Sequence, residues 1–101
     1  METRQDYKVT ELLSKVLEPA FFLLLLIRLE RLPSQVKLAK MLGIERRKVG
    51  RRLNQLIDLG FVRAVPGKHQ YILNSPLPPA HQQVINFFTH QIKDTDRWFD
   101  E

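Results

Sequence analysis

The helical hydrophobic pattern in the middle of the chain is interrupted at Gly43 and gives way to a β-type pattern after Gly60. Residues 35–42 and 45–59 carry apolar residues at helical spacing, whereas residues 61–73 hold two short β-type runs. Gly43 and Gly60 follow the two helical segments, where a residue with positive φ ends a helix at least cost. The pattern predicts a helix, a tight turn, a second helix and a β-hairpin. The residues expected to face the core are Val36, Leu38, Ala39 and Leu42 in the first helix, and Val49, Leu53, Leu56 and Ile57 in the second.

Helical patterns also flank this segment on both sides. An apolar stripe runs over residues 9–31 and is interrupted by Pro19, where a helix can begin or bend. Ser34 is a suitable N-cap for the helix at 35–42, because its hydroxyl accepts a free backbone N–H. We expect a single domain, mostly α with a short β-hairpin (an α+β fold). Its parts are an N-terminal helical region at 9–31, a helix-turn-helix at 34–59, a hairpin at 61–73 and a C-terminal helix at 80–100.

Residues 34–73 carry a resemblance to a known family. Ala39 lies where the two short helices would cross, Gly43 follows four residues later in the turn, and Val49 follows six residues after that. The second helix ends in Leu-x-x-Leu-Ile-x-x-Gly-Phe-Val (residues 53–62) and runs into the hairpin. This segment resembles the helix-turn-helix of MarR-type and related winged-helix regulators. The resemblance implies a recognition helix that enters the major groove of DNA, a hairpin that serves as the wing, and dimerisation through the terminal helices.

The charge distribution points to a polyanionic partner. Residues 31–70 hold ten Lys or Arg and two acidic residues, a net charge of +8, whereas the rest of the chain is −3. A basic middle between neutral or acidic ends is typical of nucleic-acid binding. The charge alone leaves open a solvated basic face that has no partner.

The predicted contacts with DNA follow from the side of the second helix that faces away from its apolar stripe. Arg47 and Arg51 lie one turn apart on that side, which suits bidentate hydrogen bonds to guanine edges. Lys68 at the hairpin tip is expected to hold the phosphate backbone. The complete predicted DNA-binding set is Ser34, Gln35, Arg46, Arg47, Lys48, Arg51, Arg52, Gln55, Arg63, Lys68 and His69.

Two residues depart from the expected pattern of the second helix. Arg52 stands where the resembled family usually carries an apolar residue. It either holds a phosphate or pairs internally with Glu30 or another acid. Gly50 lies inside the helix, at a cost of about 1 kcal/mol relative to Ala. It either permits a close approach of DNA or of another helix, or it has no role.

The C-terminal helix is predicted to join two copies of the chain. Its aromatic-rich face exceeds what the helix-turn-helix core needs, and such a face on a monomer would be a sticky surface. The alternative is that this helix folds back on its own core. The predicted dimer interface consists of Val84, Ile85, Phe88, Ile92, Trp98 and Phe99.

Other classes of function find little support in the sequence. The chain has no cysteine, so disulfides and thiolate metal sites are excluded and an intracellular location fits. His69, His81 and His90 show no ligand spacing, and we expect no metal, cofactor or catalytic residue. The apolar run at 20–27 is too short to cross a bilayer, and the N-terminus does not resemble a signal peptide.

The expected function is therefore that of a cytoplasmic, nucleoid-associated transcription regulator. It would be a repressor that binds double-stranded DNA at a palindromic operator as a homodimer. A plasmid or viral replication or partition protein would use the same contacts, and a winged helix used for protein–protein contact is the other alternative. Whether a small-molecule effector binds stays open.

Overall fold

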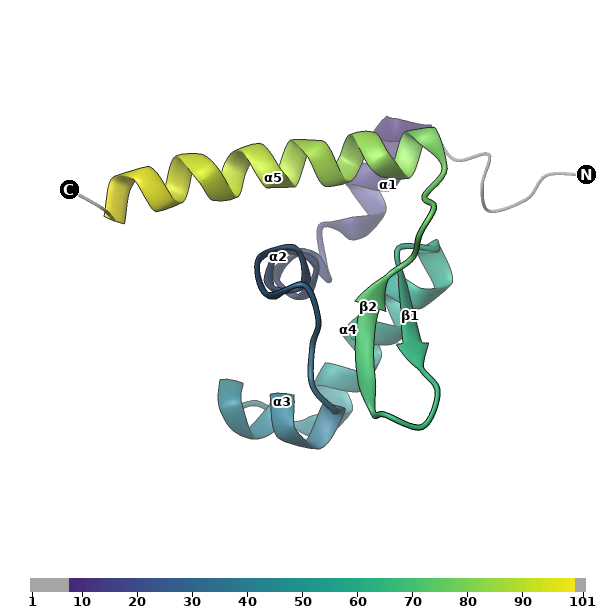
Figure 1. Cartoon of the computed structure of the whole chain (residues 1–101), viewed down its shortest axis with the longest axis vertical. Helices are drawn as coiled ribbons and strands as arrows, with labels where there is room; N and C mark the ends of the chain where they lie inside the picture. Colours follow the sequence, from purple (N-terminus) through teal and green to yellow (C-terminus); the bar gives the residue numbers. More distant parts are fainter. Residues whose placement is uncertain (1–7, 100–101) are drawn as a thin grey trace, which may run out of the picture.

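A computed structural model describes residues 8–99 of the chain, and the side chains of residues 8–90 (Figure 1). Five helices and two strands follow one another in this part of the chain, which confirms the predicted mostly α fold with a short hairpin. The topology is that of a winged helix-turn-helix. The elements are α1 (Val9–Val16), α2 (Ala20–Leu29), α3 (Gln35–Leu42), α4 (Arg46–Leu59), β1 (Val62–Val65), β2 (Gln70–Leu73) and α5 (Pro79–Phe99).

The local signals at the ends of α3 and α4 work as the sequence predicts. The Ser34 hydroxyl accepts a hydrogen bond from the backbone N–H of Lys37 at 3.3 Å and caps α3. Gly43 follows α3 with φ of +67°, and its N–H donates to the Ala39 carbonyl, so the chain turns at once into α4. Glu45 precedes α4 but makes no capping hydrogen bond with its side chain.

Strands β1 and β2 form an antiparallel hairpin, called the wing here together with the turn at residues 66–69. Val62 pairs with Leu73 at the base, and Val65 pairs with Gln70 next to the turn. Leu32, in the connection between α2 and α3, pairs with Tyr71 through two backbone hydrogen bonds of 2.9 Å. This isolated β-bridge, which the sequence pattern did not predict, ties the wing to the chain just ahead of α3.

The core lies between α1, α2, α4, the base of the wing and the first half of α5. Its fully buried side chains are Leu12, Val16, Leu23, Leu26, Leu32, Leu38, Val49, Leu53, Leu56, Phe61, Val62 and Val84. Val36, which was predicted to face inward, is 46% exposed instead. The reason is geometric: Val36 lies two residues before Leu38, about 200° away around the helix, so the two cannot share a face.

The first half of α5 belongs to the core of its own chain. Val84, Ile85 and Phe88 are at most 8% exposed, because α5 packs across α1 and α2 (Figure 1). The apolar face of this half of α5 is therefore needed by the core and is not surplus to it. For these three residues the structure favours the alternative interpretation, in which the helix folds back on its own core.

His81 anchors the start of α5 to the junction of α4 and the wing. The imidazole is 1% exposed, and its Nε2 lies 2.7 Å from the carbonyl oxygen of Leu59. A carbonyl only accepts, so Nε2 carries the proton of this hydrogen bond. The ring also packs against Phe61, with 4.7 Å between ring centroids. His81 thus contributes to the packing of α5 against the junction of α4 and the wing.

Replacing His81 by Ala should destabilise the fold strongly. The variant loses a buried ring and leaves the Leu59 carbonyl without this donor, so we expect the free energy of unfolding to fall by about 3 kcal/mol. Gln83→Ala, on an exposed position of the same helix, should change it by no more than about 0.5 kcal/mol. Urea denaturation of both variants is the test. Equal stability of the two would show that the His81 contacts are not needed for the docking of α5.

Candidate nucleic-acid interface

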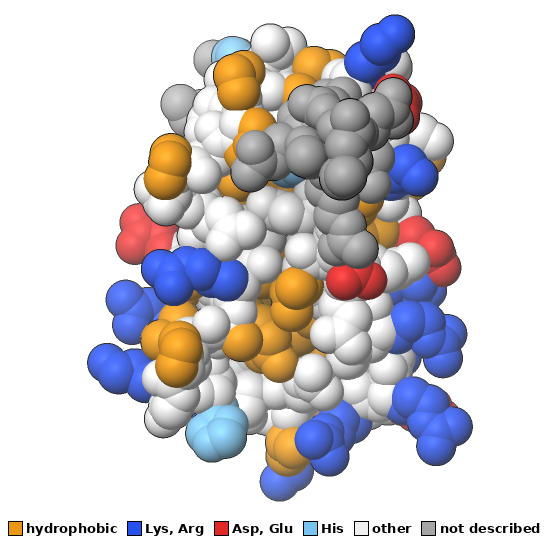
Figure 2. Space-filling view, turned by 90° about the vertical axis from the view of Figure 1, so that its right-hand side faces the viewer, with side chains coloured by type: hydrophobic (Ala, Val, Ile, Leu, Met, Phe, Trp, Pro, Cys, Tyr) orange, Lys and Arg blue, Asp and Glu red, His pale blue; other side chains and the backbone are white. Residues whose placement is uncertain are grey.

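Basic side chains gather at one end of the molecule. In Figure 2, Lys and Arg side chains crowd the lower half of the face shown, which is the end that holds α3 and the wing tip in Figure 1. Seven of the eleven predicted DNA-binding residues are exposed, and the other four are half-buried. The exposed ones are Arg46, Arg47, Lys48, Arg51, Arg63, Lys68 and His69, and the half-buried ones are Ser34, Gln35, Arg52 and Gln55.

A cleft of about 710 Å³ runs along α4 next to the first residue of α3. It brings together three of the predicted arginines with two residues that carry amide groups, and Gly50 forms part of the wall. The lining residues are Gln35, Arg46, Arg47, Gly50, Arg51 and Asn54. Guanidinium and carboxamide groups are the side chains that hydrogen-bond phosphates and base edges, and no acid lines this cleft.

A second cleft, of about 430 Å³, lies between α3 and the wing. It brings His69 of the wing together with Arg46 of α4, two residues that are far apart in the sequence. Its lining residues are Ser34, Gln35, Val36, Arg46, His69 and Tyr71. Sequence reasoning missed Tyr71, because a tyrosine in a short strand looks like an ordinary sheet residue.

Gln35 and Arg46 line both clefts, and Gln35 is held by contacts on two sides. Its Nε2 donates to the Tyr71 hydroxyl at 3.0 Å. Its Oε1 faces Gly50 so closely that a Cβ added there would lie 2.9 Å from it. Gly50 therefore permits a close approach by the side chain of Gln35, the first residue of α3.

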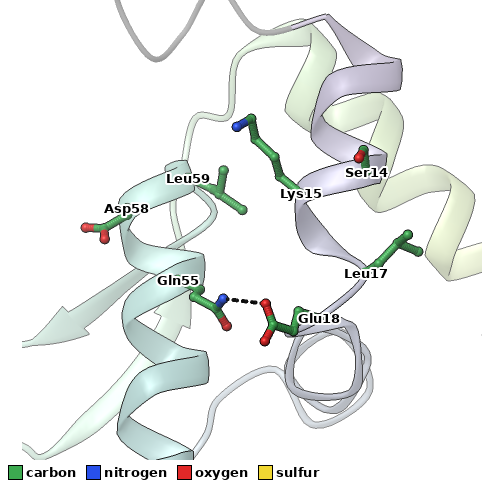
Figure 3. Close-up of a pocket in the computed structure, with 7 residues that line it drawn as sticks. All are labelled: Ser14, Lys15, Leu17, Glu18, Gln55, Asp58 and Leu59. Carbon is green, nitrogen blue, oxygen red and sulfur yellow. Dashed lines mark hydrogen bonds between the residues drawn. The ribbon is translucent and has the colours of Figure 1, made fainter.

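Arg52 and Gln55 point away from the clefts, toward the turn between α1 and α2. Arg52 Nη1 forms an ion pair of 2.5 Å with Glu18. Gln55 Nε2 donates to the same carboxylate at 3.0 Å, as Figure 3 shows. Arg52 Nη1 also donates to Gln55 Oε1 at 3.2 Å. The structure thus shows the internal pairing that was one interpretation of Arg52, with Glu18 as the acid instead of Glu30. We leave both residues out of the interface proposed below.

The hydrogen bonds from Gln55 and Arg52, together with the positive charge of Arg52, hold the pKa of Glu18 below its ordinary value. They stabilise the ionised carboxylate, so that form is favoured at neutral pH. The network joins the α1–α2 turn to the middle of α4.

Arg63 lies apart from the other predicted residues. It is exposed on β1, opposite Ile72, and lines a cleft of about 340 Å³ at the base of the wing with Asn74 and Ser75. The structure therefore brings Arg46, Arg47, Arg51 and His69 into two adjoining clefts and leaves Arg63 outside them.

The predicted dimer interface divides into two parts. Val84, Ile85 and Phe88 are covered within the chain, whereas the side chains of Ile92, Trp98 and Phe99 lie outside the described residues. Large apolar side chains are exposed elsewhere: Leu17 (73%), Phe21 (54%), Leu29 (50%) and Phe87 (49%) lie on or next to α1, α2 and α5.

Comparisons with known proteins identify no relative. No family model, no curated protein and no solved structure matches the chain. Within the described residues, His, Asp and Glu side chains form no cluster that could hold a metal ion, and none of the helices there is long and apolar enough to cross a membrane.

The Glu18 network predicts a pH-dependent stability. Because the folded-state pKa of Glu18 is below the ordinary value of 4.5, the contact stabilises the fold above that pH and is lost as the pH falls through the folded-state pKa. The thermal midpoint of the wild type should exceed that of Glu18→Gln at neutral pH, and the difference should shrink as the pH is lowered to about 3. In an Arg52→Ala, Gln55→Ala background the Glu18→Gln substitution should have little effect at any pH. A constant difference across the pH series would contradict the assignment.

Proposed function

We propose that this protein binds double-stranded DNA through α4 and the wing, and that it acts as a transcription regulator, most simply a repressor at a palindromic operator. The observation that carries the proposal is the acid-free cleft lined by Arg46, Arg47 and Arg51 along the solvent side of α4. A major groove is about 12 Å wide and admits one α-helix, so arginines on the outer side of that helix reach base edges.

The parts of the surface have different roles in this proposal. Arg47 and Arg51 read bases, because bidentate guanidinium contacts to guanine are the commonest specific contact. Arg46, Lys48 and Lys68 hold phosphates, which fixes the register of the protein on the duplex. The acidic residues Glu18 and Asp58 line a different cleft, between α1 and α4 (Figure 3).

Two other functions would use the same fold. A replication or partition protein would make the same contacts at an origin or a centromere site, so the bound sequence and its genomic context distinguish it from a repressor. A winged helix used for protein contact needs no basic cleft along α4. The cleft therefore favours the DNA-binding proposals.

The first test of DNA binding is its dependence on salt. Neutralising roughly 6–10 phosphates per dimer should lower the affinity by about 10³–10⁵ between 50 and 200 mM salt, because bound counterions are released. Fluorescence anisotropy with a labelled duplex measures this directly. A flat salt titration, or no binding at low salt, would reject the proposal.

Variants of α4 and the wing test which residues read bases. On a site selected from a random DNA pool, Arg47→Ala or Arg51→Ala should cost about 1–3 kcal/mol and relax the preference at one position. Lys68→Ala should weaken binding to all sequences alike. Arg52→Ala is the matched control: it removes a neighbouring arginine that pairs with Glu18, so DNA affinity should stay nearly unchanged. If the variants Arg51→Ala and Arg52→Ala lose the same affinity as each other, on the selected site and on random DNA alike, the base-reading assignment is wrong.

We also propose that the protein is a homodimer joined by its terminal helices, with an interface that includes the outer face of α2. Nine of the ten residues of α2 are apolar, yet Phe21 and Leu29 are at least half exposed. A helix that is apolar on all sides is normally buried on all sides. The second half of α5 runs on past α2 (Figure 1). A second copy that laid this half of α5 against α2 would cover Phe21 and Leu29 and bring two copies of α4 to one operator.

The dimer predicts different effects for two exposed apolar residues. Phe21→Ser should give a monomer, whereas Met41→Ser, at a similarly exposed apolar position on α3 (61% against 54%), should leave a dimer. Light scattering of the full chain at tens of micromolar reports the mass, and circular dichroism checks that each variant is folded. Point substitutions suit this test, since removal of α5 would also remove Val84 and Phe88 from the core. A wild type that is monomeric at this concentration would rule out the dimer.

A further inference from the structure

The covalent structure does not fix the wing tip relative to the arginines of α4. The wing follows the C-terminal end of α4 through Gly60 and Phe61, whereas Arg46 and Arg47 lie at its N-terminal end. A helix of 14 residues is about 20 Å long, so the two DNA-contacting regions are well separated along the chain. Contacts across space must therefore hold the wing tip in place.

Gln35 makes the side-chain contact that links the two regions. Its Nε2 donates to the hydroxyl of Tyr71, which lies on β2 three residues after Lys68. Its Oε1 lies against Gly50, in the middle of the cleft-forming part of α4, with no room there for a methyl group. One carboxamide thus bridges α4 and the wing from the first residue of α3.

The backbone of Tyr71 is held separately. Tyr71 exchanges two backbone hydrogen bonds with Leu32, each 2.9 Å long, in the connection that leads into α3. Removing the Tyr71 hydroxyl therefore leaves the backbone of the strand attached and removes only the side-chain hydrogen bond with Gln35. This makes Tyr71→Phe a selective change that does not dismantle the wing.

We propose that Gln35 is a positioning residue: by resting on Gly50 and holding the Tyr71 hydroxyl, it fixes the spacing between the wing tip and the arginines of α4 so that both contact one duplex. The proposal rests on the DNA-binding function proposed above. Gln35 and Arg46 line both clefts, so a shift of this carboxamide changes the boundary between the two basic surfaces.

The test is a set of paired substitutions read by DNA affinity. Tyr71→Phe should weaken binding to the selected site about three- to tenfold, the effect of losing one hydrogen bond. In a Lys68→Ala background the same change should have almost no further effect, because the wing contact that it supports is already gone. In an Arg51→Ala background it should keep its full effect. Gly50→Ala, which displaces the Gln35 carboxamide, should show the same pattern.

A matched control separates positioning from a general loss of stability. Gln82→Ala removes a side-chain hydrogen bond of the same length, 3.0 Å to Asn86, on the exposed side of α5, and should leave DNA affinity unchanged. Unchanged affinity of Tyr71→Phe, or equal losses in the Lys68→Ala and Arg51→Ala backgrounds, would overturn the positioning role.

Amide hydrogen exchange tests the same link without DNA. The amides of residues 62–73 should exchange severalfold faster in Tyr71→Phe than in the wild type, whereas those of the first half of α5 should not change. Unchanged exchange in the wing would overturn the link itself. If the wild type binds no duplex, both the proposed function and the role of Gln35 in DNA binding are rejected. If the wing amides still exchange faster in Tyr71→Phe, the Gln35–Tyr71 contact is supported even though the proposed function is not.

Discussion

The packing of α3 against α4 sets the position of nearly every other part of the basic surface. Leu38 and Ala39 of α3 and Val49, Gly50 and Leu53 of α4 are buried, and all but Gly50 belong to the hydrophobic core. With its apolar stripe buried there, α4 has to present Arg47, Arg51 and Asn54 to solvent. The absence of a side chain at Gly50 also leaves the space in which Gln35 lies.

Local sequence signals predicted this region well because its ends and its faces are set locally. The Ser34 cap, Gly43 in the turn and the stripe of α4 each depend on residues within a few positions. The pairing of Leu32 with Tyr71 could not be predicted in the same way, since it joins segments 39 residues apart and involves backbone groups alone. The Gln35–Tyr71 hydrogen bond is non-local for the same reason. Neither glutamine nor tyrosine, as a residue type, indicates which distant residue it will hydrogen-bond.

The terminal helices show why periodicity alone cannot decide between folding and assembly. A stripe at helical spacing tells which side of α5 is apolar, but the same stripe would suit its own core or a second chain. Val84 and Phe88 are buried within the chain because α5 packs across α1 and α2. The exposed Phe21 shows that α5 covers only part of that helix. An apolar run as continuous as 20–27 therefore indicates burial against several partners.

Arg52 shows that a count of basic residues gives only an upper limit on contacts with DNA. Residues 46–52 hold five Lys or Arg side chains, but the last of them, Arg52, is turned toward Glu18. It lies about 100° around the helix from its neighbour Arg51. The slope of log affinity against log salt concentration falls by about one unit for each phosphate contact that is not made. This single ion pair should therefore change the salt dependence of the proposed DNA binding measurably. The hydrogen bond from Gln55 and this pair lower the pKa of Glu18 and hold its carboxylate on the side of α4 away from the basic clefts. In the proposed complex with DNA, this network would withdraw one arginine from the interface and also hold a carboxylate away from the phosphates.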